Sequence, residues 1–222
     1  MKIVAIELSS AVGDVALLES DRIVARREIP FLHGRVYGLF GVLEEVREES
    51  AWTWGDVDVF AAGRGPGRYS GMRVALTAAR GLALPGGTSV FAVSSGAALA
   101  AATMAERSDV DQVAVVGDAR RGQAWFGVYE RATQGVEPVG DWRMAAYADL
   151  SSALPPGAVR VTSEWSRLAA HVVNESSRGD WVEQDRYPSA EWVGRLAHVA
   201  RRAGWASEPL APIYLHPAVN VS

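Results

Sequence analysis

The least ordinary stretch of this chain is the nine residues Gly63-Arg64-Gly65-Pro66-Gly67-Arg68-Tyr69-Ser70-Gly71. They follow an apolar segment, Val57–Ala62, that is typical of a buried strand, and they precede Met72–Leu84, which has the composition of a helix. A glycine-rich connection from strand to helix offers backbone N–H groups to an anion, and Arg64, Arg68 and Arg73 add positive charge. The loop is therefore a candidate anion site with Ser70 as a candidate helix cap. A tight connection that only packs against its sheet explains the same residues.

The loop differs from the two common nucleotide-binding loops. No Gly-Lys-Ser/Thr follows it, and Arg68 occupies the third glycine position of the dinucleotide fingerprint. Lys2 is the only lysine and the chain has no cysteine. This composition excludes disulfides, thiolate nucleophiles and cysteine metal sites, and it excludes a catalytic lysine anywhere but the N-terminus.

The elements around the loop predict an α/β fold with mixed sheets flanked by helices, because strands in sequence alternate with crossover helices. We expect strands at Lys2–Leu8, Gly13–Glu19, Arg22–Ile29, Val57–Ala62, Ser89–Val93, Asp111–Gly117 and Gln123–Glu130. We expect helices at His33–Ser50, Met72–Leu84, Ser95–Arg107, Glu164–Asn174 and Ala190–Ala203. Residues 131–160 are expected to be irregular, and the tail from Pro209 extended. A boundary near residue 105 would divide the 222 residues into lobes 1–105 and 106–222.

Two of these helices have faces that need an explanation. Gly34, Gly38 and Gly41 are spaced to lie opposite the apolar face of the first. Met72–Leu84 is apolar nearly all round, apart from a stripe at Arg73, Thr77 and Arg80. Loose surface composition explains the glycines; close approach of another helix, from this chain or from a partner, also explains them.

Catalytic motifs are scarce. The histidines, at positions 33, 171, 198 and 216, are never three or four residues apart, so we expect no metal site. A Gly-x-Ser-x-Gly elbow is absent, which disfavours serine hydrolysis. Asp118, at a turn between strands, is suited to a metal–nucleotide, although a local ion pair with Arg120 is the simpler explanation.

The net charge and the N-terminal sequence bear on the binding partners and on the location of the protein. The net charge of −4 argues against a general nucleic-acid binder, although Arg64, Arg68, Arg73, Arg120 and Arg121 leave a local basic patch for tRNA as an alternative. The apolar run at the N-terminus is interrupted at Glu7, too early for a signal peptide, and we expect a cytoplasmic protein.

Several motifs together resemble the TsaB (YeaZ) family. They are the glycine–arginine loop with Arg73, the helix ending Gly81-Leu82-Ala83-Leu84, Val93-Ser94 before an alanine-rich helix, Asp118-Ala119-Arg120-x-Gly122, and Pro212-Ile213-Tyr214-Leu215. The resemblance implies a two-lobed fold of the actin/hexokinase/Hsp70 type. It also implies a role in making threonylcarbamoyladenosine beside the anticodon of tRNAs that read codons starting with A.

In that system TsaB is a non-catalytic partner of TsaD, the threonylcarbamoyl transferase. The resemblance therefore implies a heterodimer with TsaD, a larger complex with the ATPase TsaE and tRNA, and a homodimer when TsaD is absent. TsaD carries a His-x3-His metal pair, and the matching positions here are Ser95 and Leu99, which cannot ligate a metal. The first strand ends Glu7-Leu8-Ser9-Ser10, where active relatives place Asp. No tightly bound cofactor is expected, and ATP or ADP at a TsaB–TsaD interface is left open.

We expect two groups of functional residues and no catalytic or metal-binding residue. The anion or cleft group is Gly63, Arg64, Gly65, Pro66, Gly67, Tyr69, Ser70, Gly71, Asp118 and Arg120. The partner interface, on helices 33–50 and 71–84, is Gly34, Gly38, Gly41, Met72, Arg73, Leu76 and Arg80. The alternatives are a nucleotide-dependent phosphotransferase of the same fold and, less favoured, a glycoprotease-like peptidase.

Overall fold

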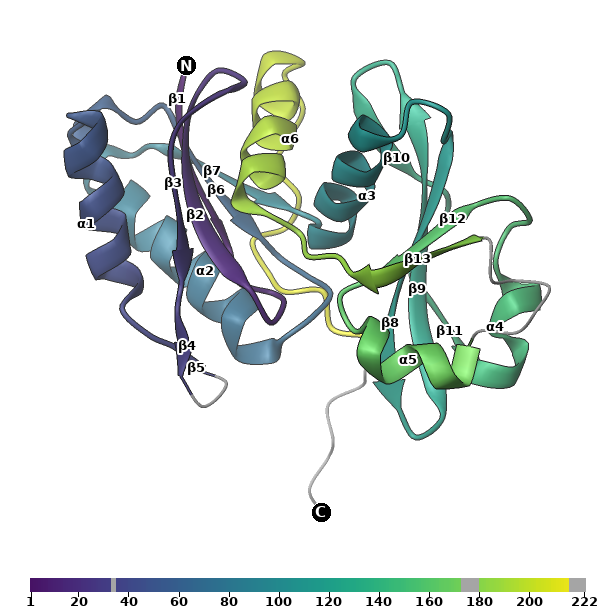
Figure 1. Cartoon of the computed structure of the whole chain (residues 1–222). Helices are drawn as coiled ribbons and strands as arrows, with labels where there is room; N and C mark the ends of the chain where they lie inside the picture. The colour runs from purple at the N-terminus through teal and green to yellow at the C-terminus, as the bar shows by residue number, and fades with distance from the viewer. Residues whose placement is uncertain (33–34, 173–179, 216–222) are drawn as a thin grey trace. The chain divides into compact units, whose positions relative to one another are not determined.

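The structure, a computed structural model, describes residues 1–32, 35–172 and 180–215 (Figure 1). The chain divides into two compact units. The first unit holds Met1–Leu99 and Tyr187–Ile213, and the second holds Ala100–Arg186 together with Tyr214 and Leu215. We expected residues 106–222 to form one lobe, and the structure differs at Tyr187–Ile213. The reason is that helix α6 (Ala190–Arg202) buries Ala190, Val193 and Ala197 against strands of the first unit.

The first unit contains one five-stranded mixed sheet with the order β3-β2-β1-β6-β7. Its strands are β1 (Lys2–Glu7), β2 (Gly13–Glu19), β3 (Arg22–Ile29), β6 (Val59–Gly63) and β7 (Ser89–Val93). The first three form an antiparallel meander, and β6 and β7 extend it in parallel to β1. The expected meander and crossover strands are therefore confirmed.

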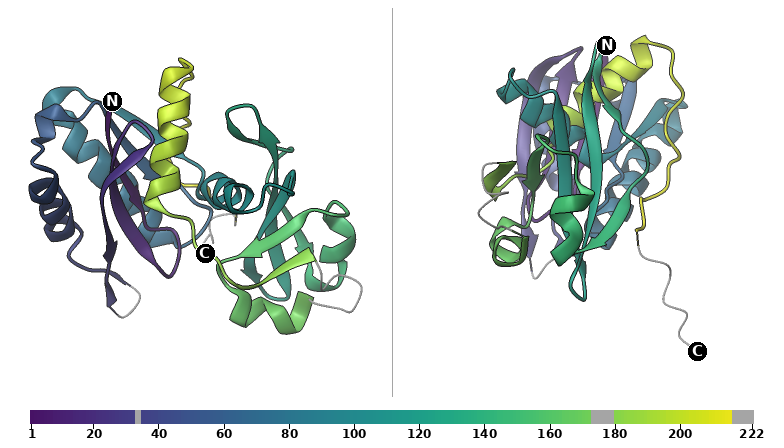
Figure 2. Two further views of the ribbon diagram at one scale, coloured as in Figure 1. Left: turned by 45° about the horizontal axis from the view of Figure 1, so that its top comes forward. Right: turned by 90° about the vertical axis from the view of Figure 1, so that its right-hand side faces the viewer.

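Helices cover both faces of this sheet. Helices α1 (Leu39–Ser50) and α2 (Tyr69–Ala83) share one apolar core with side chains such as Val4, Ile6 and Phe60. The alternate residues Ile3, Ala5 and Val59 pack with α6 on the opposite face. Figure 1 and the left view of Figure 2 both show α1 and α6 on opposite sides of strands β1 to β3. The period-two alternation of each strand thus assigns its side chains to the two cores.

Short elements complete the first unit. They are β4 (Phe31–Leu32), β5 (Arg35–Val36), η1 (Trp54–Asp56) and η2 (Leu84–Gly86). Helix α3 (Ser95–Glu106) begins in the first unit and continues into the second. The edge strand β7 is covered at Ala92, which pairs with Glu208 and donates its N–H to Ser207 Oγ at 3.0 Å.

The predicted helix His33–Ser50 is wrong at its start. Residues 31–32 and 35–36 form the small hairpin β4–β5, and α1 begins only at Leu39. Gly38 precedes it with a left-handed φ of 72°, a conformation that cannot continue a right-handed helix. His33 and Gly34 lie outside the described residues. The expected stripe of three glycines on one helix therefore does not exist, and only Gly41 lies within α1.

The second unit contains a mixed sheet with the order β10-β9-β8-β12-β13, with β11 also paired to β9. Its elements are β8 (Gln112–Arg120), β9 (Gln123–Ala132), β10 (Gly135–Pro138), β11 (Arg143–Ala146), α4 (Tyr147–Ala153), β12 (Val159–Thr162), α5 (Trp165–Val172) and β13 (Trp181–Asp185). Helices α4 and α5 pack on one face through Leu150, Leu154 and Leu168. The expectation that residues 131–160 are irregular is wrong, because three short strands and a helix lie there. Within the described residues, no helix has the length and apolar character needed to cross a membrane.

Candidate functional site

The glycine–arginine loop lies directly on the turn that follows β1. A Cβ added at Gly67 would come closer than 3.0 Å to the carbonyl oxygen of Ser9, and one at Gly71 would overlap that of Leu8. The N–H of Arg68 donates to Ser9 O at 2.7 Å. Glycine is therefore required here because two backbone segments touch.

A buried carboxyl group, that of Glu7, lies between this loop and α3. Its side chain is fully buried, and a Cβ added at Gly63 would overlap it. Ser9 N–H donates to Glu7 Oε1 at 2.6 Å, and Ser95 Oγ–H donates to Glu7 Oε2 at 2.7 Å. Ser95 Oγ also accepts the N–H of Gly65 at 2.9 Å. Burial raises the pKa of Glu7, and the hydrogen bonds from Ser9 and Ser95 offset this only in part.

Three backbone N–H groups of the loop are engaged within the first unit. The N–H groups of Arg64, Gly65 and Arg68 donate to Val93 O, Ser95 Oγ and Ser9 O. Pro66 has no N–H, and its peptide bond with Gly65 is cis. Because these three donors already have partners, this part of the loop is a packed connection and has no free N–H group to bind an anion.

Arg64 holds the C-terminal part of the unit. Its Nη1 pairs with Glu208 Oε2 at 2.6 Å, its Nε donates to Ala211 O at 2.9 Å, and its carbonyl accepts Ile213 N–H at 2.8 Å. Only 13% of its side chain is exposed. This arginine therefore fixes the segment Ser207–Ile213, part of which carries the sequence motif that begins at Pro212.

The exposed residues at the start of α2 have other roles than expected. The N-cap of α2 is Arg68, so the prediction that Ser70 caps the helix is wrong. Arg73 Nη1 donates to Tyr69 Oη at 2.7 Å and its guanidinium lies over the Tyr69 ring. Arg68 lies over the ring of Phe31. Both arginines are thus positioned by aromatic side chains at the surface.

Met72 and Leu76 belong to the core of the first unit. Their exposed fractions are 2% and 4%. A partner that docks without rearranging this unit cannot contact them, so we remove both from the predicted interface. Arg73 and Arg80 are exposed and remain in it.

A second polar cluster lies in the other unit around Asp118. Asp118 Oδ1 accepts Arg120 N–H at 2.6 Å and the Tyr147 hydroxyl at 2.9 Å, and Oδ2 pairs with Arg167 at 2.7 Å. Burial by itself raises the pKa of Asp118. The two hydrogen bonds and the charge of Arg167 outweigh it, so the pKa lies below its ordinary value.

The expected local contact with Arg120 is present, with Nη1 3.7 Å from Asp118 Oδ2. Sequence reasoning missed Tyr147 and Arg167, which make the shorter bonds to the carboxylate. They lie far along the chain and carry no local motif. The expected cleft group is therefore divided between the units, with the loop in the first and Asp118 with Arg120 in the second.

Metal ligands are not assembled at the positions where TsaD has them. Ser95 is buried and bonded to Glu7, and Leu99 is a buried apolar side chain. Across the part of the chain that the structure describes, no group of three or more His, Cys, Asp or Glu side chains could hold a metal ion. The residues present do not fit such a metal.

Comparison with known proteins identifies the family to which this chain belongs. The family model described as "TsaD: tRNA N6-adenosine threonylcarbamoyltransferase" matches residues 38–172, so the chain belongs to this family. The TsaB (YeaZ) resemblance within it is also confirmed. The "tRNA threonylcarbamoyladenosine biosynthesis protein TsaB" of Escherichia coli (strain K12) is 27% identical over 137 residues, 61% of this chain. That match spans only 58% of the E. coli protein.

Solved structures agree over nearly the whole chain. YeaZ from Pseudomonas aeruginosa has a TM-score of 0.79 and 24% identity, with 96% of this chain and 99% of that one covered. A second structure, of an uncharacterized protein with similarity to peptidase YeaZ from P. aeruginosa, has a TM-score of 0.79 and 25% identity, covering 97% and 99%. The expected architecture, two mixed sheets flanked by helices, is confirmed.

Proposed function

We propose that this chain is a non-catalytic partner of TsaD in the biosynthesis of threonylcarbamoyladenosine in tRNA, with TsaE and tRNA reaching it through the complex. Membership of the TsaD family and similarity to TsaB support the pathway. The observation that carries the non-catalytic role is that both candidate carboxyl groups are occupied by this chain's own groups. Glu7 is bonded to Ser9 and Ser95, and Asp118 to Arg120, Tyr147 and Arg167.

These contacts leave few carboxylate oxygens available to bind a metal or a nucleotide. Metal and phosphoryl-transfer sites need carboxylate oxygens directed at the metal or nucleotide. The Glu7 carboxyl is sealed from solvent, and the Asp118 side chain is only 8% exposed. A chain that keeps the fold of an enzyme but closes its carboxyl groups in this way is suited to act as a scaffold.

The surface we assign to the partner is the outer side of α1 and α2, here called the docking face. Because both helices pack their inner sides on the same sheet face, their outer sides face away from it. Its apolar members, with large exposed fractions, are Phe40, Tyr69 and Val74, and the exposed Tyr37 and Leu84 lie just beyond the ends of the two helices. Its charged members are Glu44, Glu45 and Glu48 of α1, and Arg73 and Arg80 of α2.

Apolar side chains flanked by charges are typical of protein interfaces. In a symmetric homodimer each acidic α1 would meet the basic α2 of the other copy. The same face therefore suits both TsaD and, in its absence, a second copy. A stable interface here should bury at least about 1,000 Å².

Deleting the gene is expected to remove threonylcarbamoyladenosine from tRNAs that read codons starting with A, as measured by mass spectrometry of digested tRNA. The purified chain alone should transfer no threonylcarbamoyl group, while adding it to TsaD, TsaE and the activated donor should restore transfer. Normal modification in the deletion strain would refute the pathway. Transfer by the isolated chain would refute the non-catalytic role.

The double variant Phe40→Glu/Val74→Glu is expected to weaken pairing with TsaD by at least about 100-fold, because an unpaired charge would be buried at the interface. Both side chains are exposed, at 62% and 37%, so the isolated unit should fold normally. The measurement is co-purification and titration calorimetry with TsaD.

Val139→Glu is the matched control. Its side chain is 40% exposed and lies in the second unit, so this variant should pair like the wild type. If the double variant also pairs like the wild type, the docking face is assigned to the wrong helices.

A further inference from the structure

The C-terminal end of α6 presents two exposed arginines. Arg201 and Arg202 are exposed in the last turn, and neither makes an ion pair or side-chain hydrogen bond among the residues that the structure describes. Most other arginines of the first unit are paired, as Arg22 is with Glu19 and Arg26 with Asp14. The guanidinium groups of Arg201 and Arg202 therefore keep all their donors for an external ligand.

An exposed tryptophan follows at a fixed position. Gly204, with a φ of 73°, ends the helix, and the N–H of Trp205 donates to Ala200 O at 2.9 Å while that of Gly204 donates to Arg201 O. These bonds form a helix-ending turn that fixes the backbone of Trp205 beside the last turn of α6. Yet 52% of the Trp205 surface is exposed. The residue that carries this exposed ring thus follows the two exposed arginines at a fixed place on the backbone.

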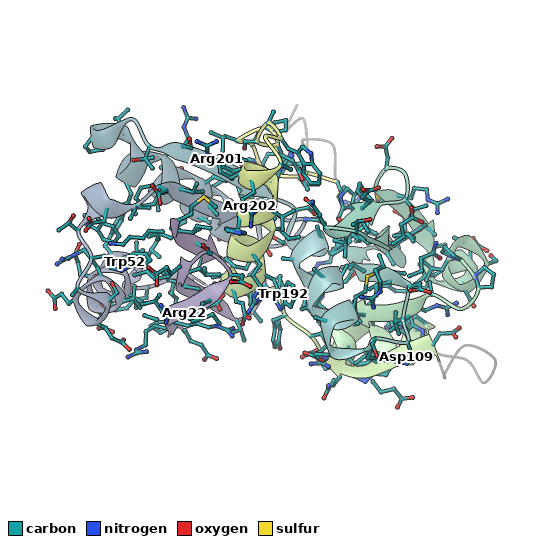
Figure 3. The ribbon with its side chains drawn as sticks, turned by 90° about the horizontal axis from the view of Figure 1, so that it is seen from above. Arg22, Trp52, Asp109, Trp192, Arg201 and Arg202 are labelled. Carbon is teal, nitrogen blue, oxygen red and sulfur yellow. The ribbon has the colours of Figure 1, made fainter. Side chains whose placement is uncertain are left out.

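The chain's N-terminus adds to this cationic end. Ser20 N–H donates to Met1 O at 2.7 Å, which ties the start of the chain to the β2–β3 turn. Figure 1 shows both at the same end of the first unit as the C-terminus of α6, and Figure 3 looks onto this end with Arg22, Arg201 and Arg202 labelled.

The charges that act on His198 also show that cationic groups lie close together at this end of the unit. Burial, the charge of Arg202 and the terminal amine all lower its pKa, so His198 is neutral at pH 7. The acidic groups nearby are Glu19, which is paired with Arg22, and Asp21. The unpaired charge of this end therefore remains positive.

The helix dipole accounts for only part of this arrangement. Arginines in a last turn stabilise a helix by interacting with its negative end. That interaction requires no exposed indole after the helix. Free guanidinium groups beside an exposed aromatic ring are the combination that contacts phosphates and stacks on unpaired bases.

We propose that Arg201, Arg202 and Trp205 form a contact site for single-stranded RNA, with the arginines on phosphates and the indole stacked on a base. The arginines in and after the glycine loop already have contacts within the chain. Arg64 is paired with Glu208, and Arg68 and Arg73 lie over aromatic rings. The choice of RNA over other polyanions rests on the proposed function in tRNA modification. Binding is tested with the chain alone, so it can fail while the modification result stands.

The test is fluorescence anisotropy of the full chain with a labelled RNA hairpin that has a single-stranded loop, over a series of salt concentrations. Trp205→Ala should weaken binding about tenfold or more, since each base stacked on an aromatic ring contributes that much. Arg201→Gln/Arg202→Gln should weaken binding and reduce the log–log salt slope by about 1.4, the value for two phosphates of a single strand. A blunt RNA duplex of equal charge should bind more weakly than the hairpin.

Arg27→Gln/Arg107→Gln is the control, because it removes the same charge from two other exposed arginines, which pair with Glu49 and Asp109 and lie outside the proposed site. This variant should keep the affinity and salt slope of the wild type. Equal losses in both double variants would show a general charge effect and overturn the site. Equal binding of duplex and hairpin, or competition by polyglutamate as effective as that by unlabelled RNA, would also overturn it.

Discussion

Gly71→Ala is expected to destabilise the first unit by about 3 kcal/mol or more, measured by denaturant unfolding. Gly71 lies in the first turn of α2, and an added Cβ would overlap the carbonyl oxygen and carbon of Leu8. Both groups are backbone, so no flexible side chain can move aside. Forcing extra volume into a packed interior costs about 1–3 kcal/mol and more where the backbone must shift.

Gly81→Ala provides the matched control on the same helix. Nothing lies within 4 Å of a Cβ added there, and the residue is exposed. Replacing a helical glycine by alanine at such a position should stabilise the unit by up to about 1 kcal/mol. The two identical substitutions should therefore have opposite signs. A mild effect of Gly71→Ala would show that the loop does not rest on the β1 turn.

The glycine loop illustrates what local sequence can predict. Its position between a strand and a helix follows from composition, and α2 is found there with its start moved to Tyr69. The number of glycines indicated close packing. The partner of that packing, the turn Leu8–Ser9, is brought in by the sheet and has no signal in the loop itself.

The error at α1 has a different cause. The spacing of apolar residues extended the helix pattern back to His33, but the left-handed Gly38 and the pairing of Phe31 with Val36 stop it. Side-chain periodicity does not report a backbone angle that only glycine adopts readily.

The contacts of Arg64 and Asp118 could be predicted only in part, because most of their partners lie far away in the sequence. Arg64 pairs with Glu208, 144 residues away, and Arg167 with Asp118, 49 residues away. These contacts depend on tertiary structure, so an isolated motif such as Asp118-Ala119-Arg120 suggested a local ion pair and missed the shorter one. Burial of Met72 and Leu76 was missed because a helix with apolar residues on every side does not reveal which side faces its own sheet.

Glu7→Gln is expected to stabilise the first unit increasingly as pH rises. The fold raises the pKa of Glu7 above its ordinary value of 4.5, so the native chain holds a proton that the unfolded chain releases. Stability therefore falls as pH rises from 4.5 to the folded pKa, by at most about 1.4 kcal/mol per pH unit. Glutamine is neutral at every pH and lacks this loss. Its amide accepts from Ser9 N–H and donates to Ser95 Oγ, whose hydroxyl can reorient.

The measurement is unfolding free energy for wild type and variant from pH 4 to above the folded pKa. The difference should be small below pH 4.5 and reach a plateau above that pKa. Asp14 also has a raised pKa, and its charge is one cause of the raised pKa of Glu7, so the wild-type profile reports two coupled groups. Glu45→Gln, at an exposed position of α1, should show no such rise.

A flat difference for Glu7→Gln would mean that Glu7 ionises in the fold as readily as in the unfolded chain. A rise that continues beyond pH 7 would mean that the carboxyl is neutral at physiological pH. A neutral carboxyl bonded to Ser95 and Ser9 is a poor ligand for a magnesium–nucleotide, because it carries no charge to attract the cation. The pH profile thus tests, without any activity assay, whether the closed carboxyl group can serve catalysis or only the structure of a partner subunit.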